Sequence, residues 1–416
     1  MNEPETRYAH AGADRVAYQL LGDGERDLLF TAGLWGHLDV VWENPAIARY
    51  LRRLGGFSRL IRFDRRGSGV SDPRPDDGGN VAAHWNEDLL AVLDACRSQA
   101  PIIIANIDAG PLALDFVARH PLRCSGLIFA NATACLFKAP GYAEGHDAEM
   151  LDRIHGEMLH GWGSEEFAAR FAPSQARNPD VLRWYAKFQR AMASPRAIAD
   201  NLALLQQIDS RAVLPTIRVP TLVIAREHLE YFPPSQSRYI ASQIPAARYV
   251  ELPGADGMLY WEGADESLAL IEEFVTGRRG GIKPDRQLAT VLFTDIVDST
   301  RHAVKLGDAA WRELLDRHDQ TVREQISHFG GKLVDSAGDG TLAMFGSPGA
   351  AIDCAHAIHT AMKPLRLRVR AGAHIGELEL REDGRVGGIA VHIGARVLGM
   401  ARAGDVCWCR APCATC

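Results

Sequence analysis

The most constraining feature of this chain is the alternation of short apolar runs with amphipathic stretches over residues 14–132. Four of the runs have the length and composition of buried strands: DLLFTAG (27–33), FSRLIRFD (57–64), PIIIAN (101–106) and GLIFANA (126–132). Two of the stretches between them have helical periodicity: WNEDLLAVLDAC (85–96) and PLALDFVARH (111–120). Strands that alternate with helices form a parallel sheet covered on both faces. We therefore expect the chain to begin with an α/β domain.

The strand pattern stops and later resumes. Residues 137–212 have helical patterns only, and apolar runs return at PTLVIAR (220–226) and ARYVELPG (247–254). A sheet interrupted by helices and then continued is one domain with a helical cap. We expect this domain to occupy residues 1–277, with the cap at about 137–212.

Composition places the chain among ordinary water-soluble globular proteins. It has 416 residues, 47% of them hydrophobic, and a formal net charge of −6. This mild acidity gives no electrostatic reason to expect binding to nucleic acid or to an anionic membrane. The N-terminal residues lack the basic start and apolar core of a signal peptide, and no apolar stretch has the length of a transmembrane helix. We expect a cytoplasmic protein.

A second domain follows a linker. RRGGIKPDRQ (278–287) is rich in glycine, proline and charge, which is typical of linkers. Strand-like sequence begins again directly after it. We expect a second domain over residues 288–406 and an unusual cysteine-rich tail over residues 407–416.

Two motifs in the first domain resemble those of the α/β-hydrolase family. FDRRGSGVSD (63–72) is similar to the family's strand-and-turn signature, and NIDAG (106–110) stands where G-x-S-x-G would form the nucleophile elbow. The elbow is a strained turn that exposes a nucleophile beside backbone N–H donors. The resemblance covers about residues 14–277, implies a hydrolase fold with a cap, and puts Asp108 in the place of the nucleophile.

The rest of the hydrolase triad departs from the family pattern. The resemblance puts Gly257, in GADG, where the family has its histidine, and Leu229 where it has its acid. An aspartate nucleophile still needs a histidine to activate the water that cleaves the ester intermediate. His228 and His37 are alternatives that their spacing does not favour. We interpret the Asp108 site as degenerate, with a pocket that binds a small-molecule ligand or a partner.

The second domain carries four motifs that resemble the catalytic domain of class III nucleotide cyclases, an α+β fold. In chain order they are ATVLFTDIVDST (289–300), GGKLVDSAGDGTLAMF (330–345), VRAGAHIGE (369–377) and GGIAVHIGARV (387–397). The resemblance implies an adenylate cyclase, a phosphorus–oxygen lyase in signal transduction that converts ATP to 3′,5′-cyclic AMP and pyrophosphate. It also implies a homodimer, because the family builds each site from two subunits.

The implied chemistry uses two divalent ions per site. Two such ions lower the pKa of the attacking ribose hydroxyl and neutralise the leaving group. By resemblance the ligands are the carboxylates of Asp295 and Asp339 with the carbonyl of Ile296, and oxygen ligands suit Mg²⁺ or Mn²⁺. Arg396 matches the arginine that stabilises charge on the phosphates, and His392 stands where the family often orients the ribose.

Base selection is left open by the residues. The positions that contact the base hold Asp335 and Arg385. An acid–arginine pair can satisfy guanine, with the carboxylate accepting from N1–H and arginine donating to O6. It can equally accept from the adenine N6 amine and donate to N1. The family favours ATP, and GTP is the alternative substrate.

The tail departs from the cyclase pattern altogether. CWCRAPCATC (407–416) replaces the final strands of that domain, and one choice of codons gives the family's sequence in another reading frame. We hypothesise a frameshift, with a C-x-C-x₃-C-x₂-C zinc site as the alternative. The loss of the last strands predicts an impaired or inactive cyclase. The rival interpretations are a hydrolase that uses Asp108 and an inactive signalling protein.

Overall fold

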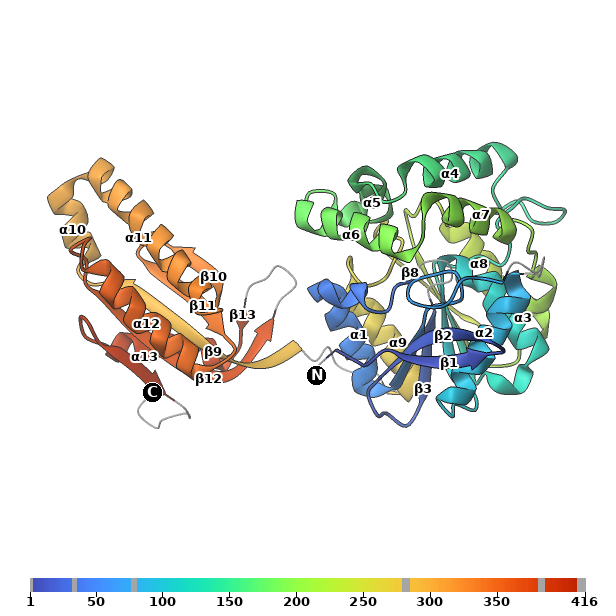
Figure 1. Ribbon diagram of the computed structural model, residues 1–416, viewed down its shortest axis with the longest axis horizontal. Coiled ribbons are helices and arrows are strands. Elements are labelled where there is room, and N and C mark those ends of the chain that lie inside the picture. Colours follow the sequence, from blue (N-terminus) through green and yellow to red (C-terminus); the bar gives the residue numbers. More distant parts are fainter. Residues whose placement is uncertain (1–2, 32–35, 76–80, 279–284, 381–385, 410–416) are drawn as a thin grey trace. The chain divides into compact units, whose positions relative to one another are not determined.

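The computed structural model describes residues 3–31, 36–75, 81–278, 285–380 and 386–409 (Figure 1). The chain divides into two compact units, Met1–Ile282 and Lys283–Cys416. Each unit has its own sheet and its own hydrophobic core, and each is described by itself.

An eight-stranded sheet forms the centre of the N-terminal unit, with the order β1-β2-β4-β3-β5-β6-β7-β8. The strands are β1 (Arg7–Ala11), β2 (Asp14–Leu21), β3 (Asp27–Thr31), β4 (Arg59–Phe63), β5 (Ile102–Asn106), β6 (Gly126–Ala130), β7 (Thr221–Arg226) and β8 (Arg248–Leu252). From β4 to β8 all neighbours are parallel, while β1 and β2 add an antiparallel edge. The expected α/β fold is therefore confirmed, with an additional hairpin at its start.

Helices cover both faces of this sheet (Figure 1). They are α1 (Pro45–Phe57), α2 (Val81–Ala95), α3 (Gly110–Arg119), α8 (Pro234–Gln243) and α9 (Ala264–Thr276). The first and last, α1 and α9, pack together, and a hydrogen bond of 3.3 Å joins Tyr50 Oη to Ser267 Oγ between them. Every residue of β5, β6 and β7 is buried. This burial on both faces explains why these strands are continuous apolar runs rather than alternating ones.

The helical cap lies between β6 and β7 in the chain. It comprises α4 (Ala148–Gly161), α5 (Glu165–Phe171), the 3₁₀ turn η4 (Pro173–Gln175), α6 (Pro179–Met192) and α7 (Pro195–Leu205). Each of its four α-helices begins at a side-chain cap: Asp147, Ser164, Asn178 and Ser194 accept hydrogen bonds from first-turn amides. Such a cap is worth about 1 kcal/mol. The helix boundaries of the cap are thus encoded locally.

The C-terminal unit is an α+β domain on a six-stranded, mainly antiparallel sheet. The strand order is β10-β11-β9-β12-β13, and β14 pairs in parallel with β12. Its strands are β9 (Asp285–Ile296), β10 (Lys332–Ala337), β11 (Gly340–Phe345), β12 (Val369–Leu380), β13 (Val386–Gly387) and β14 (Val406–Cys409). Its helices are α10 (Ser299–Leu306), α11 (Asp308–His328), α12 (Pro348–Met362) and α13 (Ile389–Met400).

The two faces of this second sheet have separate cores. Leu292 and Ala371 face a cluster that includes residues of α11 and α12, whereas Val291 and Leu378 pack with Ala390 of α13. Successive residues of a strand point to opposite faces, which produces this division. Among the described helices of the whole chain, none has the length and apolar character needed to cross a membrane.

Candidate functional site

The turn between β5 and α3 has the geometry of a nucleophile elbow. Ile107, the first residue after β5, has φ 51°. A positive φ at a β-branched residue is a strained outlier, of the kind that clusters at functional sites. Gly110, which begins α3, is required by close packing, because a Cβ there would lie 2.1 Å from the carbonyl oxygen of Thr133. The elbow is therefore present in the backbone.

The residue at the strained position is not the one expected from the motif. In a nucleophile elbow the strained residue carries the reactive atom, and here that residue is Ile107. Asp108 is the next residue, in the 3₁₀ turn η2 (Ile107–Ala109), and it is 1% exposed. The structure thus places Asp108 one position beyond the place that the motif assigned to it.

Asp108 lies in the field of a buried arginine. Burial lowers the pKa of Arg65 to about 10, and the negative charge of Asp108 opposes that shift. Both side chains are buried. A buried carboxylate lowers the cost of burying a nearby cation, which is a structural reason for an acid at position 108.

An aromatic side chain of the cap fills the space beside the expected histidine position. Gly257 lies in the segment after β8, and its N–H donates to the carbonyl of Phe171, at 2.9 Å. A Cβ on Gly257 would stand 3.1 Å from Cδ1 of that phenylalanine. Phe171, the last residue of α5, is itself stacked on Tyr231 with ring centroids 5.0 Å apart. A larger residue at position 257 therefore has no space unless Phe171 moves.

Asp256, the acid next to Gly257 in the GADG stretch, is hydrogen-bonded to the cap. Asp256 accepts hydrogen bonds from the N–H of Ser174 (3.0 Å) and its Oγ (2.6 Å), and from the N–H of Glu262 (3.2 Å). Burial raises the pKa of Asp256, and these hydrogen bonds oppose the rise. Ser174 belongs to η4, so Asp256 joins the cap to the segment after β8.

The residues considered as substitutes for the triad do not complete it. Leu229, at the expected acid position, is buried. His228 has a side chain that is 75% exposed and lies 3.8 Å from Glu227. His37 accepts from the N–H of Val40 at 3.4 Å. Neither histidine has a described contact with the elbow.

A small cavity lies beside the carboxyl ends of β3 and β4. Its volume is about 30 Å³, and its walls include Phe30, Arg62, Asp64, Phe188 of the cap and Tyr260. That is room for about one water molecule, whereas ligand sites usually measure 300–1,000 Å³. A ligand of ordinary size could enter this crevice only if the cap moved.

The wall of the cavity contains two buried titratable groups, Asp64 and Arg62. Asp64 Oδ2 accepts from the N–H groups of Leu38 (3.1 Å) and Val70 (3.0 Å), while its Oδ1 has no hydrogen-bond partner among the described residues. Burial raises the pKa of Asp64 and lowers that of Arg62 to about 10. Of these two groups, the Arg62 guanidinium can donate a hydrogen bond to the oxygen of a carbonyl compound.

In the C-terminal unit the structure brings together the three residues proposed as metal ligands. Asp295 pairs with Gly340 across β9 and β11, and the N–H of Ile296 donates to the carbonyl of Asp339 at 3.2 Å. However, Asp295 Oδ2 accepts from Arg370 Nε (2.8 Å) and Nη2 (2.5 Å). In the part of the chain that is described, no three or more His, Cys, Asp or Glu side chains are grouped to hold a metal ion. In this structure Arg370 occupies one oxygen of Asp295, and the Mg²⁺ or Mn²⁺ site stays a sequence-based prediction.

The other predicted nucleotide contacts are dispersed or undescribed. His392 and Arg396 are exposed and one turn apart on α13, and Asp335 is exposed on β10. Arg385 lies outside the described residues. The homodimer likewise stays a prediction. Of the four tail cysteines, Cys407 and Cys409 belong to β14, and the other two lie outside the described residues.

Comparison with known proteins agrees with the fold of the first unit. Residues 28–264 match the alpha/beta hydrolase fold family, and the chain belongs to that family. It is 32% identical over 149 residues to the 2-hydroxymuconate semialdehyde hydrolase of Pseudomonas putida. The matched residues make up 30% of this chain and 52% of that protein. It is 27% identical over 204 residues to the polyketide synthase ThaQ of Burkholderia thailandensis, covering 47% of this chain and 9% of the synthase.

A solved structure shows the same fold. The enol-lactonase of Burkholderia xenovorans LB400 superposes with a TM-score of 0.54 at 24% sequence identity, over 65% of this chain and all of the lactonase. The chain spans about half the length of the semialdehyde hydrolase and a small fraction of the synthase.

These findings correct the prediction of an adenylate cyclase. The family comparison finds the hydrolase family and no cyclase family, and a curated relative is a hydrolase. The prediction of a lyase that forms cyclic AMP is therefore wrong. The C-terminal unit stands as an antiparallel α+β domain, and nothing identifies it as a cyclase domain.

Proposed function

We propose that the N-terminal unit binds a small carbonyl compound in the crevice beneath its helical cap and does not hydrolyse it. The observation that carries this proposal is the isoleucine at the strained position of the elbow. Hydrolases of this fold attack a carbonyl with the side chain at that position. The side chain of Ile107 has no nucleophilic atom.

The position of the histidine supports the same conclusion. Release of a covalent intermediate needs a base that activates water. Gly257 supplies no side chain, and Phe171 packs against the place where one would begin. An enzyme with neither nucleophile nor base loses the chemical step and can keep the binding step.

The crevice retains features that suit binding. Two buried polar side chains, Asp64 and Arg62, lie in the wall of the cavity beneath the cap. The relative from Pseudomonas putida is named for a semialdehyde substrate. A carbonyl oxygen of such a compound could accept from Arg62 once the cap has moved outward.

The proposal is tested by separating binding from turnover. Wild-type protein is incubated with p-nitrophenyl acetate, p-nitrophenyl butyrate and γ-butyrolactone, and product release is followed over many enzyme equivalents. We expect no product above the rate in buffer. The same compounds, and non-hydrolysable ketones of equal size, should raise the midpoint of thermal unfolding of the wild type. Arg62→Met should lose that shift, and multiple turnovers by the wild type would overturn the proposal.

A second candidate function is hydrolysis through Asp108. It is favoured by one observation: the carboxylate is adjacent to the strained residue of an elbow in a family of hydrolases. An attacking aspartate would form a covalent ester with the substrate. Mass spectrometry after incubation with an epoxide or a haloalkane would reveal one added group on Asp108, and Asp108→Asn would remove it. An unlabelled wild-type chain that also releases no diol or alcohol product would exclude this candidate, because turnover returns Asp108 to its free form.

A further inference from the structure

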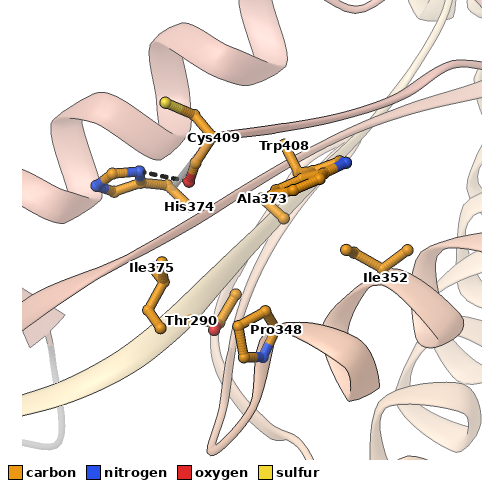
Figure 2. A pocket seen from close by; sticks show the side chains of 8 residues that line it. All are labelled: Thr290, Pro348, Ile352, Ala373, His374, Ile375, Trp408 and Cys409. Carbon is orange, nitrogen blue, oxygen red and sulfur yellow. Dashed lines mark hydrogen bonds between the residues drawn. The ribbon is translucent and has the colours of Figure 1, made fainter. Parts of the chain in front are cut away.

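Two cavities differ in what their polar groups offer to a ligand. The larger, of about 320 Å³, lies in the C-terminal unit between the sheet and α12 (Figure 2). The hydroxyl of Thr290 in its wall is fully enclosed, and His374 is already hydrogen-bonded to the carbonyl of Cys409, at 3.0 Å. These walls select no class of ligand. The small cavity beneath the cap, by contrast, has a charged donor in its wall.

Among the described residues, Arg62 is a buried cation without an ion pair. It is 7% exposed, and its guanidinium donates to one acceptor, the side-chain oxygen of Gln19, at 3.3 Å. A guanidinium has five N–H donors, and buried charges are normally paired. The Nε and Nη2 atoms of Arg65 are fully enclosed, but those of Arg62 are not, so they are open to the cavity that Arg62 lines. Arg66 shows the usual solution, since it donates to three carboxylates.

The guanidinium of Arg62 is held in place by neutral groups. The Oε1 atom of Gln19 that accepts from Arg62 also accepts from Trp42 Nε1, at 2.9 Å. The guanidinium carbon lies 5.9 Å from the centroid of the Trp42 ring. Burial lowers the pKa of Arg62 to about 10, so the side chain remains a cation at neutral pH. A charged donor that is fixed by neutral partners is preorganised for an anion.

A phenol borders the same cavity. Tyr260 lines the cavity and is 6% exposed, and its hydroxyl has no hydrogen-bond partner among the described residues. Its ring is fixed by edge-to-face contacts with Tyr50, at 6.2 Å, and Trp261, at 4.8 Å. Burial raises the pKa of Tyr260, and the charge of Arg62 opposes this rise, as expected for neighbouring groups. The cavity therefore has a second donor beside the guanidinium.

The rest of the wall is mainly apolar. It includes Phe30, Val41, Leu51 and Phe188. Asp64 lies in the same wall, but it forms no described ion pair with Arg62, and burial raises the pKa of its carboxyl, which favours the uncharged form. We propose that the ligand of this crevice is a carboxylic acid with an apolar chain, bound as the anion with its carboxylate on Arg62 and Tyr260. This inference rests on the function proposed for the crevice and narrows its ligand from carbonyl compounds in general to carboxylates.

The test uses probes that share one chain and differ in the end group: hexanoate, hexanamide and 2-heptanone. Their dissociation constants for the full chain are measured by ligand-observed NMR titration at about pH 7.5, where hexanoate and Arg62 are both charged. We expect hexanoate to bind about tenfold more tightly than either neutral probe, because hydrogen bonds between charged groups are the stronger ones. Arg62→Met should abolish this preference, because methionine removes the charge and keeps an apolar side chain.

Two further variants make the result specific. Arg52 also lies over the Trp42 ring, at 5.6 Å, but it is not among the residues described in the cavity wall. Arg52→Met removes an equal charge from the same tryptophan and should leave most of the preference intact. Tyr260→Phe keeps the ring contacts and should reduce the preference about threefold, the effect of one lost hydrogen bond. Circular dichroism of each variant checks that it is folded.

Two results would overturn the inference and leave the proposed function standing. The first is equal binding of hexanoate and 2-heptanone by the wild type, which would make the ligand neutral. The second is a preference for hexanoate that survives in folded Arg62→Met. If none of the probes binds to the folded wild type at millimolar concentration, the function proposed for the crevice fails as well.

Discussion

At the elbow the N-terminal unit has the backbone of a hydrolase site, but the side chain at the strained position, Ile107, has no nucleophilic atom. At the end of β9 the C-terminal unit has the opposite arrangement, since charged side chains are present but are bonded to one another. Ile107 has a strained φ of 51° and a side chain without a nucleophilic atom, whereas Asp295 is bonded to Arg370 by two hydrogen bonds. Backbone geometry shows which fold family a chain belongs to. Its activity depends on side chains that are free to take part in chemistry.

The largest effect on stability should come from Arg66, in the FDRRGSGVSD stretch of the first unit. Arg66 has a side chain that is 3% exposed and donates to Asp88 (2.5 Å), Glu87 (2.8 Å) and Asp14 (3.0 Å). Arg66→Ala would leave the buried carboxylate of Asp88 without its cation, at a cost of about 3–5 kcal/mol in the free energy of unfolding. Denaturant unfolding followed by circular dichroism should show a destabilised first unit and an unchanged second unit.

The matched control for Arg66→Ala is an exposed ion pair of the cap. Arg183 pairs with Asp180, and the two side chains are 58% and 86% exposed. Arg183→Ala should change the free energy of unfolding by no more than about 1 kcal/mol. Equal effects of the two substitutions would mean that the FDRRGSGVSD signature is not what holds the first unit together.

The next effect tests the filled histidine position. Gly257→Ala places a Cβ 3.1 Å from Phe171 and should cost about 1–3 kcal/mol through overpacking. Phe171→Leu provides space, so the double variant should be more stable than the sum of the single effects predicts, and a double-mutant cycle measures this coupling. Additive effects would show that the aromatic ring does not occupy the histidine's space.

The order of the strands in the chain could be predicted from the sequence. The position of the strained residue in the elbow could not. The apolar runs at 27–33, 101–106 and 126–132 became β3, β5 and β6 because strands buried on both faces need uninterrupted apolar sequence. The hairpin of β1 and β2 was missed, since its edge strand is largely polar. A φ of 51° at Ile107 is invisible in the motif NIDAG, because isoleucine is among the residues least suited to it.

Long-range partners were also beyond reach from sequence. Phe171 is in the cap, far along the chain from Gly257, and only the folded cap brings them together. In the C-terminal unit, the structure brings Asp295 and Asp339, two residues named by resemblance, to neighbouring strands. Nothing in the sequence indicated that Arg370, on β12, would bond to Asp295. The strand β14 inside the cysteine-rich tail was likewise unexpected.

A smaller effect on stability is expected in the C-terminal unit, where Asp295 is bonded to Arg370. If the carboxylate of Asp295 serves the fold, then Asp295→Ala and Arg370→Ala should each cost about 1 kcal/mol and should not be additive. Thermal unfolding of the wild type should be the same with and without MnCl₂, because the carboxylate already has a cationic partner. A Mn²⁺-dependent rise in midpoint that Asp295→Ala abolishes would restore the metal site predicted from the sequence.

The smallest effect on stability is expected at His146, in the segment just before α4 of the cap. His146 is buried, and its Nε2 is hydrogen-bonded to the carbonyl of Tyr231 at 2.8 Å. Burial lowers the pKa of His146 below its usual 6.5, and the hydrogen bond opposes this lowering. The unfolded chain therefore takes up a proton at a higher pH than the folded chain does. The stability of the first unit should be complete above pH 6.5 and should fall as the pH drops towards the folded-state pKa. The total loss should be about 1.4 kcal/mol for every pH unit that separates the folded-state pKa from the unfolded-state pKa.

His146→Gln isolates this effect from the other histidines. Glutamine can donate to the Tyr231 carbonyl and does not titrate, so the free-energy difference between wild type and variant should change only below pH 6.5. Urea unfolding at about pH 7.5, 6.0 and 5.0 measures it. A difference that is constant across this range would mean that His146 has the same pKa in both states, and the cap entrance would then have no part in the pH response.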